Sequence, residues 1–316
     1  MPWVFVALGL LTLLLAGDFL VKGAINLAFR LGISALVVSL TVVAFGTSAP
    51  ELLIVLSAMA DDAPGLALGN IIGSNTANIL LVLGLPAMVA GLFTTNLNTK
   101  KSFVLMVFAS VLFIVLAFIG PFIWWHGALL LVALTVIFLD QAMQAHRGRR
   151  ATEAAAGVAE NVESINLSMA GWKISLYLLF GLVGLPVGAK VLVVNAEIIA
   201  QDFGMSETAI GLTLIAVGTS LPELATTTIA AIRRQADVAL GNVIGSNMIN
   251  LLAIIGIASL VGPIPVAEEF LTFDLWVMLA ASFLLIPFVF FRQNITRIWG
   301  LVLTLLYMAY LLLVLL

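Results

Sequence analysis

The sequence has no cysteine and only two histidines, His126 and His146, among its 316 residues. The absence of cysteine excludes disulfide bonds, thiolate metal sites and cysteine nucleophiles. The two histidines are separated along the chain by the length of a membrane-spanning segment, and both lie near predicted loops. A zinc site built on histidine is therefore not expected, and any ion that the protein handles should be held by oxygen ligands.

Charged residues are also scarce. They make up 9% of the chain, whereas apolar residues make up 63%. A soluble domain carries about 25% charged residues and fewer than half apolar ones. A water-soluble core cannot hide this amount of apolar side chain, so we predict an integral membrane protein.

The apolar residues fall into ten segments that are long enough to cross a bilayer, which takes about 20 residues per helix. The predicted spans are 3–27, 33–59, 65–92, 102–120, 123–142, 172–199, 205–231, 238–263, 272–291 and 298–316. No basic residue precedes the first apolar run, so we interpret it as a transmembrane helix and not as a cleaved signal peptide. These features predict an all-α fold.

Loops with Lys or Arg alternate along the chain with loops that carry only acidic residues. The basic loops hold Arg30, Lys100, Lys101, Arg147, Arg149, Arg150, Lys173, Arg233, Arg234, Arg292 and Arg297, and the acidic loops hold Asp61, Asp62, Asp202, Glu207, Glu268, Glu269 and Asp274. Because Lys and Arg stay on the cytoplasmic side, we predict that both termini lie outside and that the polar linker 144–171 is cytoplasmic. A prokaryotic plasma membrane is the expected location.

Two motifs occur twice at one offset. GTSAPEL begins at Gly46 and GTSLPEL at Gly218, while GNIIGSN begins at Gly69 and GNVIGSN at Gly241, and each pair is 172 residues apart. This register indicates a duplicated unit, with repeat regions at 32–91 and 204–263. Glycines in the second motif should let its helix approach the GTSxPEL helix closely.

Each half contains five predicted spans, so the second half must enter the membrane from the opposite side. We predict ten transmembrane helices in two five-helix inverted-topology repeats, 1–143 and 172–316, joined by the linker 144–171. Inverted repeats are typical of secondary transporters, whose sites lie near the membrane midplane between the repeats. Some channels share this architecture.

Glu51 and Glu223 occupy equivalent positions within apolar segments. A carboxylate at membrane depth is costly and usually functional, so the pair predicts one central site. A protonated acid that is hydrogen-bonded within the bundle is the structural alternative. Each glutamate follows a proline, which cannot donate to the carbonyl four residues earlier. The carbonyls expected to be freed are those of Gly46 and Gly218 and of their neighbours Ala44, Thr47, Ala216 and Thr219.

Hydroxyl and amide side chains share helix faces with these acids, because residues three or four apart lie on one face. The positions concerned are Thr47, Ser48, Ser74 and Asn78 in the first half and Thr219, Ser220, Ser246 and Asn250 in the second. Hard cations such as Ca²⁺ take six to eight oxygen ligands of these kinds. Two carboxylates neutralise one divalent or two monovalent cations, so one site can exclude one ion while it holds another. Charge matching also allows a proton as the counter-ion.

The four motifs in register resemble the two α-repeats of the cation/calcium exchanger superfamily, in particular its sodium/calcium exchanger branch. The resemblance implies antiport of Na⁺ and Ca²⁺ by alternating access, with no cofactor and no required protein partner, and with spans 1 and 6 as sliding gate helices. It implies a Ca²⁺ site at Glu51, Glu223, Thr47 and Thr219, and Na⁺ sites at Ala44, Ser48, Ser74, Asn78, Ala216, Ser220, Ser246 and Asn250. Some family members carry an aspartate where this chain has Asn250, so the amide weakens the case for potassium co-transport.

Three other functions are compatible with parts of the sequence. The nearest is a H⁺/Ca²⁺ exchanger, because buried glutamates can also carry protons. A cation channel would use the same repeats, whereas an intramembrane protease would need paired aspartates that the motifs lack. The remaining charges inside spans, Asp18, Lys22, Lys190 and Glu197, are expected to extend toward the membrane interface.

Overall fold

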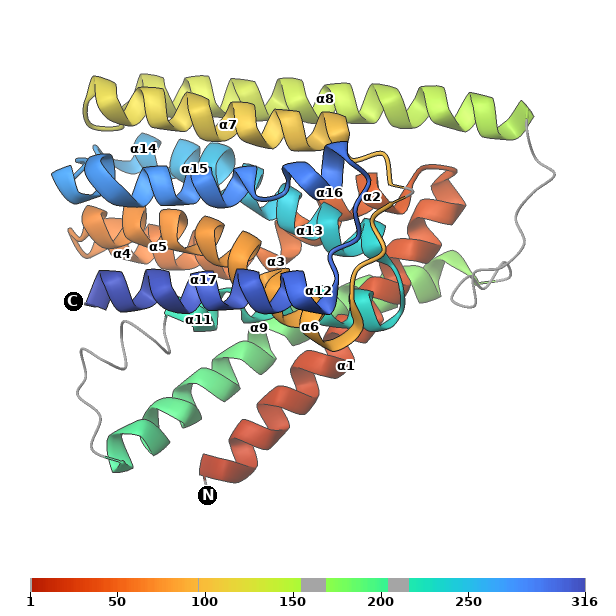
Figure 1. Cartoon of the computed structure of the whole chain (residues 1–316), viewed down its shortest axis with the longest axis horizontal. Helices are drawn as coiled ribbons and strands as arrows, with labels where there is room; N and C mark the ends of the chain where they lie inside the picture. Colours follow the sequence, from red (N-terminus) through yellow and green to blue (C-terminus); the bar gives the residue numbers. More distant parts are fainter. Residues whose placement is uncertain (1, 96, 155–168, 204–215, 316) are drawn as a thin grey trace.

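A computed structural model describes residues 2–95, 97–154, 169–203 and 216–315 (Figure 1). Nearly all of the described residues are helical, and their only β-structure is two isolated bridges. The predicted all-α fold is confirmed.

Two sets of helices at corresponding positions form the two halves. The first half contains α1 (Pro2–Leu31), α2 (Ala35–Val38), η1 (Ser39–Val43), α3 (Ala44–Thr47), α4 (Ala49–Ala60), α5 (Pro64–Ala77), η2 (Asn78–Val82), α6 (Gly84–Ala90), α7 (Lys100–Ile119) and α8 (Trp124–Ala154). The second contains α9 (Gly171–Asp202), α11 (Ala216–Thr219), α12 (Leu221–Ile232), α13 (Ala236–Met248), η4 (Ile249–Ile254), α14 (Ile255–Val261), η5 (Phe270–Asp274), α15 (Leu275–Phe283), α16 (Ile286–Phe290) and α17 (Arg297–Leu315). The η elements are π-helical turns within longer helices.

Eight helices among the described residues are long and apolar enough to cross a membrane, and α2–α4 forms a ninth that bends by 41°. The remaining predicted span, 205–231, is represented by α11 and α12, and its first part lies outside the described residues. The ten-span plan is therefore confirmed. α8 continues as a helix to Ala154, past the predicted start of the linker.

The two longest oblique helices, α1 and α9, pack side by side against a layer of nearly parallel helices (Figure 1). Glycines allow this contact, because a Cβ on Gly188 would lie 2.9 Å from the backbone nitrogen of Leu13 and one on Gly9 would lie 2.7 Å from that of Leu192. Small residues permit close helix approach in membranes. Spans 1 and 6 therefore form one tightly packed helix pair.

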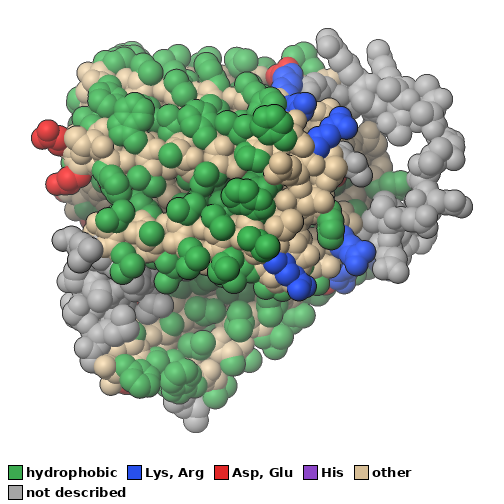
Figure 2. Space-filling view, in the orientation of Figure 1, with side chains coloured by type: hydrophobic (Ala, Val, Ile, Leu, Met, Phe, Trp, Pro, Cys, Tyr) green, Lys and Arg blue, Asp and Glu red, His purple; other side chains and the backbone are tan. Residues whose placement is uncertain are grey.

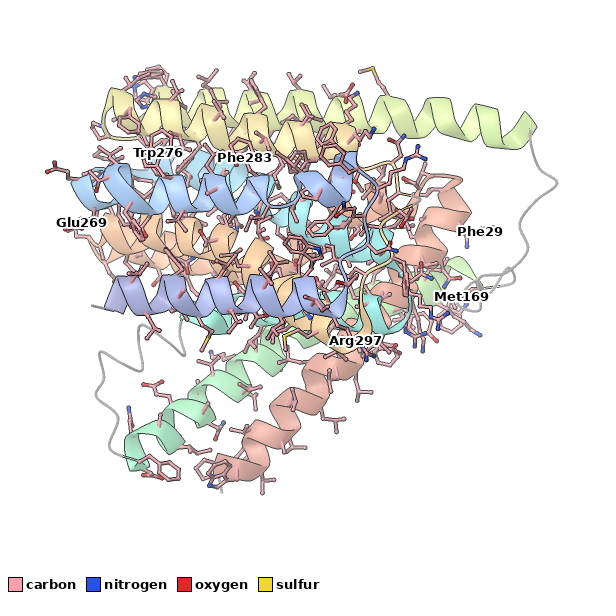
Figure 3. All side chains as sticks on the ribbon, in the orientation of Figure 1. Phe29, Met169, Glu269, Trp276, Phe283 and Arg297 are labelled. Atoms are coloured by element: carbon pink, nitrogen blue, oxygen red, sulfur yellow. The ribbon has the colours of Figure 1, made fainter. Side chains whose placement is uncertain are left out.

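Charge is segregated to the two ends of the bundle. Figure 2 shows acidic side chains at one end, Lys and Arg gathered at the other, and an apolar belt between them; Asp140 is paired with Lys101 among the basic residues. Figure 3 places Glu269 and Arg297 at these opposite ends. The alternation of basic and acidic loops along the chain thus becomes one acidic and one basic end in space.

The two halves are related by a pseudo-two-fold arrangement. Leu92 forms an antiparallel bridge with Ile295, and Phe122 forms one with Ile264. Leu92 and Ile264 are separated by the repeat offset, and Phe122 and Ile295 by one residue more. Each bridge therefore joins one half to the other, and the position that the first half contributes to one bridge is the position that the second half contributes to the other. This agrees with the predicted inverted repeat.

An ion pair joins span 1 to span 7. The Asp18 carboxylate accepts from Nε of Arg233 at 2.6 Å and lies 2.8 Å from Nζ of Lys22. The sequence predicted that Asp18 extends toward the membrane interface, and it did not predict this ion pair. Its carboxylate is 23% exposed and bound to an arginine that follows α12, so it connects α1 with α12.

We expect Arg233→Ala to lower the free energy of unfolding by about 1–2 kcal/mol, because it leaves a partly buried carboxylate with Lys22 alone. Thermal unfolding of the purified protein in detergent measures this effect. Arg297→Ala is the matched control, since Arg297 is exposed at the same end of the bundle. Equal melting temperatures for the two variants would contradict the expectation.

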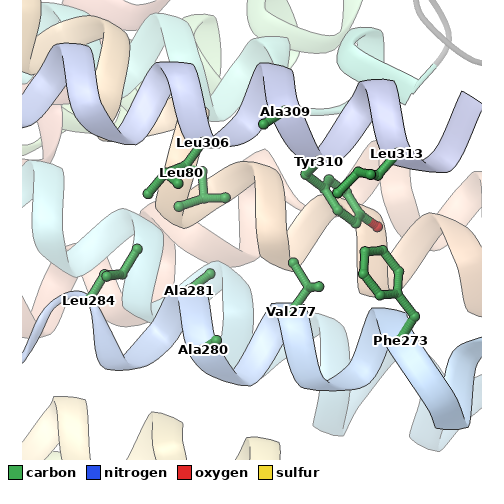
Figure 4. Close-up of a pocket in the computed structure, with 10 residues that line it drawn as sticks. All are labelled: Leu80, Phe273, Val277, Ala280, Ala281, Leu284, Leu306, Ala309, Tyr310 and Leu313. Atoms are coloured by element: carbon green, nitrogen blue, oxygen red, sulfur yellow. The ribbon is translucent and has the colours of Figure 1, made fainter.

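An apolar groove of about 350 Å³ lies between α15 and α17 (Figure 4). Its lining includes Leu80 of η2, Phe273 of η5 and Leu306 of α17. The polar atom in this lining is the Tyr310 hydroxyl, which donates to Oδ1 of Asp274 at 2.9 Å. The groove offers hydrocarbon surface and no set of oxygen ligands, so it is not a cation site.

Candidate cation site

Each GTSxPEL segment breaks its helix at the same serine. Ser48 has φ −84° and ψ 4° between α3 and α4, and Ser220 has φ −86° and ψ 5° between α11 and α12. In both cases proline occupies the first turn of the new helix, where a missing N–H costs little. The duplicated sequence therefore folds into duplicated helix breaks.

The breaks place both acids in the first turn of a helix, Glu51 in α4 and Glu223 in α12. A helix N-terminus carries a partial positive charge that favours a carboxylate. The carbonyl of Ala44, expected to be free, instead accepts from the Ser48 backbone nitrogen at 3.0 Å and from the Thr47 hydroxyl at 3.3 Å. The proline therefore does not open the turn as far back as Ala44, because the hydrogen bond to Ser48 precedes the break.

Glycines of the GNVIGSN motif bring α13 against the first half. A Cβ on Gly245 would lie 2.5 Å from the carbonyl oxygen of Leu40, and one on Gly241 would lie 2.9 Å from that of Leu36. The Ser39 hydroxyl donates to the carbonyl of Val238 at 2.7 Å. The close approach expected from these glycines is confirmed for this motif.

Both glutamates are fully buried, and they lie near enough for their charges to interact. Oε1 of Glu223 accepts from the hydroxyls of Ser48 at 3.3 Å and Ser246 at 3.4 Å. Within the described residues, neither carboxylate oxygen of Glu51 has a hydrogen-bond partner, and neither does the Ser220 hydroxyl. The contact between Ser48 and Glu223 therefore has no counterpart between Ser220 and Glu51 in this conformation.

The threonines and serines meet across the repeats in symmetric pairs. Oγ1 of Thr47 lies 3.4 Å from Oγ of Ser246, and Oγ1 of Thr219 lies 3.5 Å from Oγ of Ser74. All four hydroxyls are buried. Side chains from both halves thus surround the acids, as the spacing predicted. Ala216 lies in α11, but its side chain is outside the described part of the structure.

Asn78 is the first residue of the π-helical turn η2, Asn250 is the second residue of η4, and both are fully buried. Such turns are rare and often occur at functional sites. The Asn78 amide donates to Oδ1 of Asn247 at 3.0 Å, and the Asn250 amide donates to Oδ1 of Asn75 at 3.1 Å. Our sequence analysis did not single out Asn75 and Asn247, although both are the final residue of a repeated GSN triplet.

Seven buried oxygens in these segments lack a hydrogen-bond partner among the described residues. They are Oε1 and Oε2 of Glu51, Oε2 of Glu223, Oγ of Ser220, Oγ1 of Thr226, and Oδ1 of Asn78 and Asn250. Buried polar atoms are normally satisfied, and carboxylate, hydroxyl and amide oxygens are the kinds of ligand that Ca²⁺ takes. No cluster of three acidic or histidine side chains occurs in the described ranges, so two carboxylates set the charge of the site. The donor set fits a hard cation.

The chain is similar in sequence to known transporters. It is 35% identical to the putative antiporter CaxA of Alkalimonas amylolytica, over 90% of this chain and 88% of that protein. It is 34% identical to the sodium/calcium exchanger MaX1 of Methanosarcina acetivorans, over 96% and 95% of the two chains. A more distant relative is the Ca²⁺/H⁺ antiporter ChaA of Bacillus subtilis, at 26% identity over 64% and 60%.

The fold is similar to a solved transporter as well. Structures of the sodium-calcium exchanger NCX_Mj superpose with a TM-score of up to 0.82 at 30% sequence identity, covering 98% of this chain and 97% of that one. The family described as sodium/calcium exchanger protein matches residues 1–139 and 173–316, which include all four motifs. The chain therefore belongs to the sodium/calcium exchanger family of membrane antiporters.

Proposed function

We propose that this protein exchanges Na⁺ for Ca²⁺ by alternating access at the site between Glu51 and Glu223. The observation that carries the proposal is a fully buried pair of carboxylates, one from each repeat, with unpartnered oxygens around it. A buried pair of negative charges is stable only when it is compensated. One Ca²⁺ or two Na⁺ provide equal compensation, so the two ions compete for the same charge.

The proposed ligands follow the two helix breaks. Ca²⁺ is held between the carboxylates of Glu51 and Glu223, with the backbone oxygens of Thr47 and Thr219. Na⁺ uses the flanking oxygens of Ala44, Ser48, Ser74 and Asn78 in one half and of Ala216, Ser220, Ser246 and Asn250 in the other. The Ala44 carbonyl would exchange the hydrogen bond from the Thr47 hydroxyl for the ion. Broken helices supply such ion sites in many transporters, because their exposed ends carry free backbone groups and partial charges.

Exchange of H⁺ for Ca²⁺ is the second candidate. It is favoured by Glu51, whose two oxygens have no partner in the described residues, so that its carboxylate could bind one proton on either of them. The names of the relatives include both kinds of antiporter. Sodium is the better proposal because the hydroxyls and amides around the acids do not titrate, yet they supply the oxygens that Na⁺ requires.

We propose further that residues 1–143 and 172–316 are the two repeats and that 144–171 links them in the cytoplasm. The basic end of the bundle (Figure 2) would then face the cytoplasm and both termini the outside. The membrane is that of a prokaryotic cell.

Calcium flux under imposed gradients tests the counter-ion. In proteoliposomes with the pH clamped equal on both sides, we expect an outward Na⁺ gradient to drive Ca²⁺ uptake at least about tenfold above the rate with an outward K⁺ gradient. The measurement is ⁴⁵Ca²⁺ uptake with a matched ΔpH experiment in Na⁺-free buffer. Uptake that follows ΔpH and ignores Na⁺ would replace the sodium proposal with the proton one.

A further inference from the structure

Four buried asparagines connect the two repeats beside the proposed ion site. Asn75 and Asn247, the inner pair, lie on α5 and α13, while Asn78 and Asn250, the outer pair, lie one turn further along each helix. The two members of each pair are 172 residues apart, which is the offset between the repeats. The four side chains are at most 2% exposed. They therefore form a symmetric amide cluster at the interface between the halves.

The inner pair bonds reciprocally to backbone. The amide nitrogen of Asn75 donates to the carbonyl of Asn247 at 3.4 Å, and that of Asn247 donates to the carbonyl of Asn75 at 3.3 Å. Each inner Oδ1 then accepts from the outer amide of the opposite half, at 3.0 Å from Asn78 and 3.1 Å from Asn250. Each inner side chain is thus fixed as a donor at one end and an acceptor at the other.

This arrangement determines which end of each outer amide is free. Because the NH₂ groups of Asn78 and Asn250 are bound to the inner pair, their Oδ1 atoms point elsewhere, and these oxygens have no partner among the described residues. Asn78 lies one helical turn after Ser74, which contacts Thr219, and Asn250 lies one turn after Ser246, which donates to Glu223. The helix faces concerned are therefore those that line the site.

We infer that Asn75 and Asn247 are positioning residues for the transported cation. Each holds the outer amide of the opposite repeat so that it presents its carbonyl oxygen, and not its NH₂, to the ion. The inference rests on the proposed function, because it assigns the free oxygens of Asn78 and Asn250 to the cation. Without the inner acceptor, an outer amide could rotate and place a partial positive charge against the ion.

The same bonds fix the charge of the site. An ionised aspartate at position 250 has no hydrogen to donate, and its carboxylate would face Oδ1 of Asn75 instead of bonding to it, whereas a protonated aspartic acid could donate there but is neutral. The inner asparagines therefore favour a neutral side chain over an ionised carboxylate at both outer positions. The charge of the site is held at that of Glu51 and Glu223 alone, which one Ca²⁺ neutralises.

A double-mutant cycle of Na⁺ binding separates positioning from general packing. The probe is Na⁺ alone, and its affinity is measured by the displacement of ⁴⁵Ca²⁺ from the purified full-length protein in detergent. We expect Asn247→Ala and Asn78→Ala each to weaken Na⁺ affinity about tenfold, the range seen when an outer partner of a metal ligand is removed. The double variant should also be only about tenfold weaker, because Asn247 acts through Asn78.

The symmetric cycle with Asn75 and Asn250 should give the same coupling. The crossed double variant of Asn75→Ala with Asn78→Ala should instead be about a hundredfold weaker, because these residues serve different amides. Asn195→Ala is the matched control, since that amide donates only to the carbonyl of Val191 in its own helix, at 2.8 Å. Its affinity should equal that of the unsubstituted protein.

The possible outcomes are distinct. Additive losses in the Asn78–Asn247 cycle, or an unchanged affinity in Asn247→Ala, would overturn the positioning role while leaving the proposed function intact. Failure of Na⁺ to displace Ca²⁺ from the unsubstituted protein would overturn both. Melting temperatures measured without Ca²⁺ show whether a variant is folded. If Asn247→Ala does not fold, Asn247→Leu, which has nearly the volume of asparagine but cannot accept from Asn78, takes its place in the cycle with the same criterion.

Discussion

Glu51→Gln and Glu223→Gln are each expected to lower the rate of Ca²⁺ exchange at least about a hundredfold. A single remaining carboxylate leaves a divalent cation half-compensated at a buried site. A hundredfold loss corresponds to about 2.7 kcal/mol, which is modest beside the cost of an uncompensated charge in a membrane. Uptake of ⁴⁵Ca²⁺ into proteoliposomes under a saturating Na⁺ gradient is the measurement.

The glutamine variants should remain folded. Both oxygens of Glu51 lack a partner in the described residues, so a neutral amide of the same shape removes a buried charge and no hydrogen bond. Unfolding in Ca²⁺-free detergent should therefore occur at the same or a higher temperature. Glu269→Gln, which changes an exposed acid at the acidic end of the bundle, is the control and should transport normally. Normal Ca²⁺ flux in either site variant would exclude the central-site assignment.

Most of the architecture could be predicted from two features of the sequence, the length of the apolar runs and the spacing of the duplicated motifs. Both can be observed without knowing how the helices pack. Apolar run length determines which segments cross the membrane, and the fixed offset between Glu51 and Glu223 determines that the halves are related. The Pro50 and Pro222 helix breaks follow from the missing proline N–H alone. These features depend on single helices, which the sequence specifies without knowledge of the packing.

Contacts between the two halves were harder to predict from the sequence. The ion pair of Asp18 with Arg233 joins residues 215 positions apart, and either charge alone is compatible with a position near the membrane interface. The Asn75 and Asn247 amides lie in the same motif as Ser74 and Ser246, but only the packing of α5 against α13 shows which of them face the opposite repeat. The carbonyl of Ala44 was misjudged because its hydrogen bond depends on exactly where the helix breaks.

The difference between the halves could not be predicted at all. The motif around Glu223 is the same as that around Glu51, yet Glu223 accepts from two hydroxyls while no described residue donates to Glu51. One conformation of an inverted repeat is necessarily asymmetric when the site opens to one side only. Exchange of these two environments between the halves would produce the opposite state.

Locking α1 to α12 is expected to prevent that exchange. Gly17 of α1 lies directly on α12, because a Cβ there would be 3.3 Å from the Ala225 carbonyl carbon. We therefore place one cysteine on each side of this contact, Gly17→Cys and Ala225→Cys, so that a disulfide between them would join the two helices, and the chain has no other cysteine to interfere. If α1 slides against α12 during transport, oxidation should abolish at least about 95% of Ca²⁺ exchange, and reduction should restore it. Flux before and after oxidation, with non-reducing mass spectrometry for the bond, measures this.

A second disulfide, between α1 and α9, tests whether the loss of transport comes from locking α1 to α12 or from distortion by any disulfide on α1. A Cβ on Gly184 of α9 would lie 2.8 Å from that of Ala16 of α1, so Gly184→Cys with Ala16→Cys requires a small separation of the helices to close the bond. Because α1 and α9 pack together along their length, we expect them to move as one body and the bonded protein to retain most of its exchange. Loss of transport in both oxidised variants would mean that α1 and α9 slide against each other. Retention in both would mean that α1 does not move relative to α12.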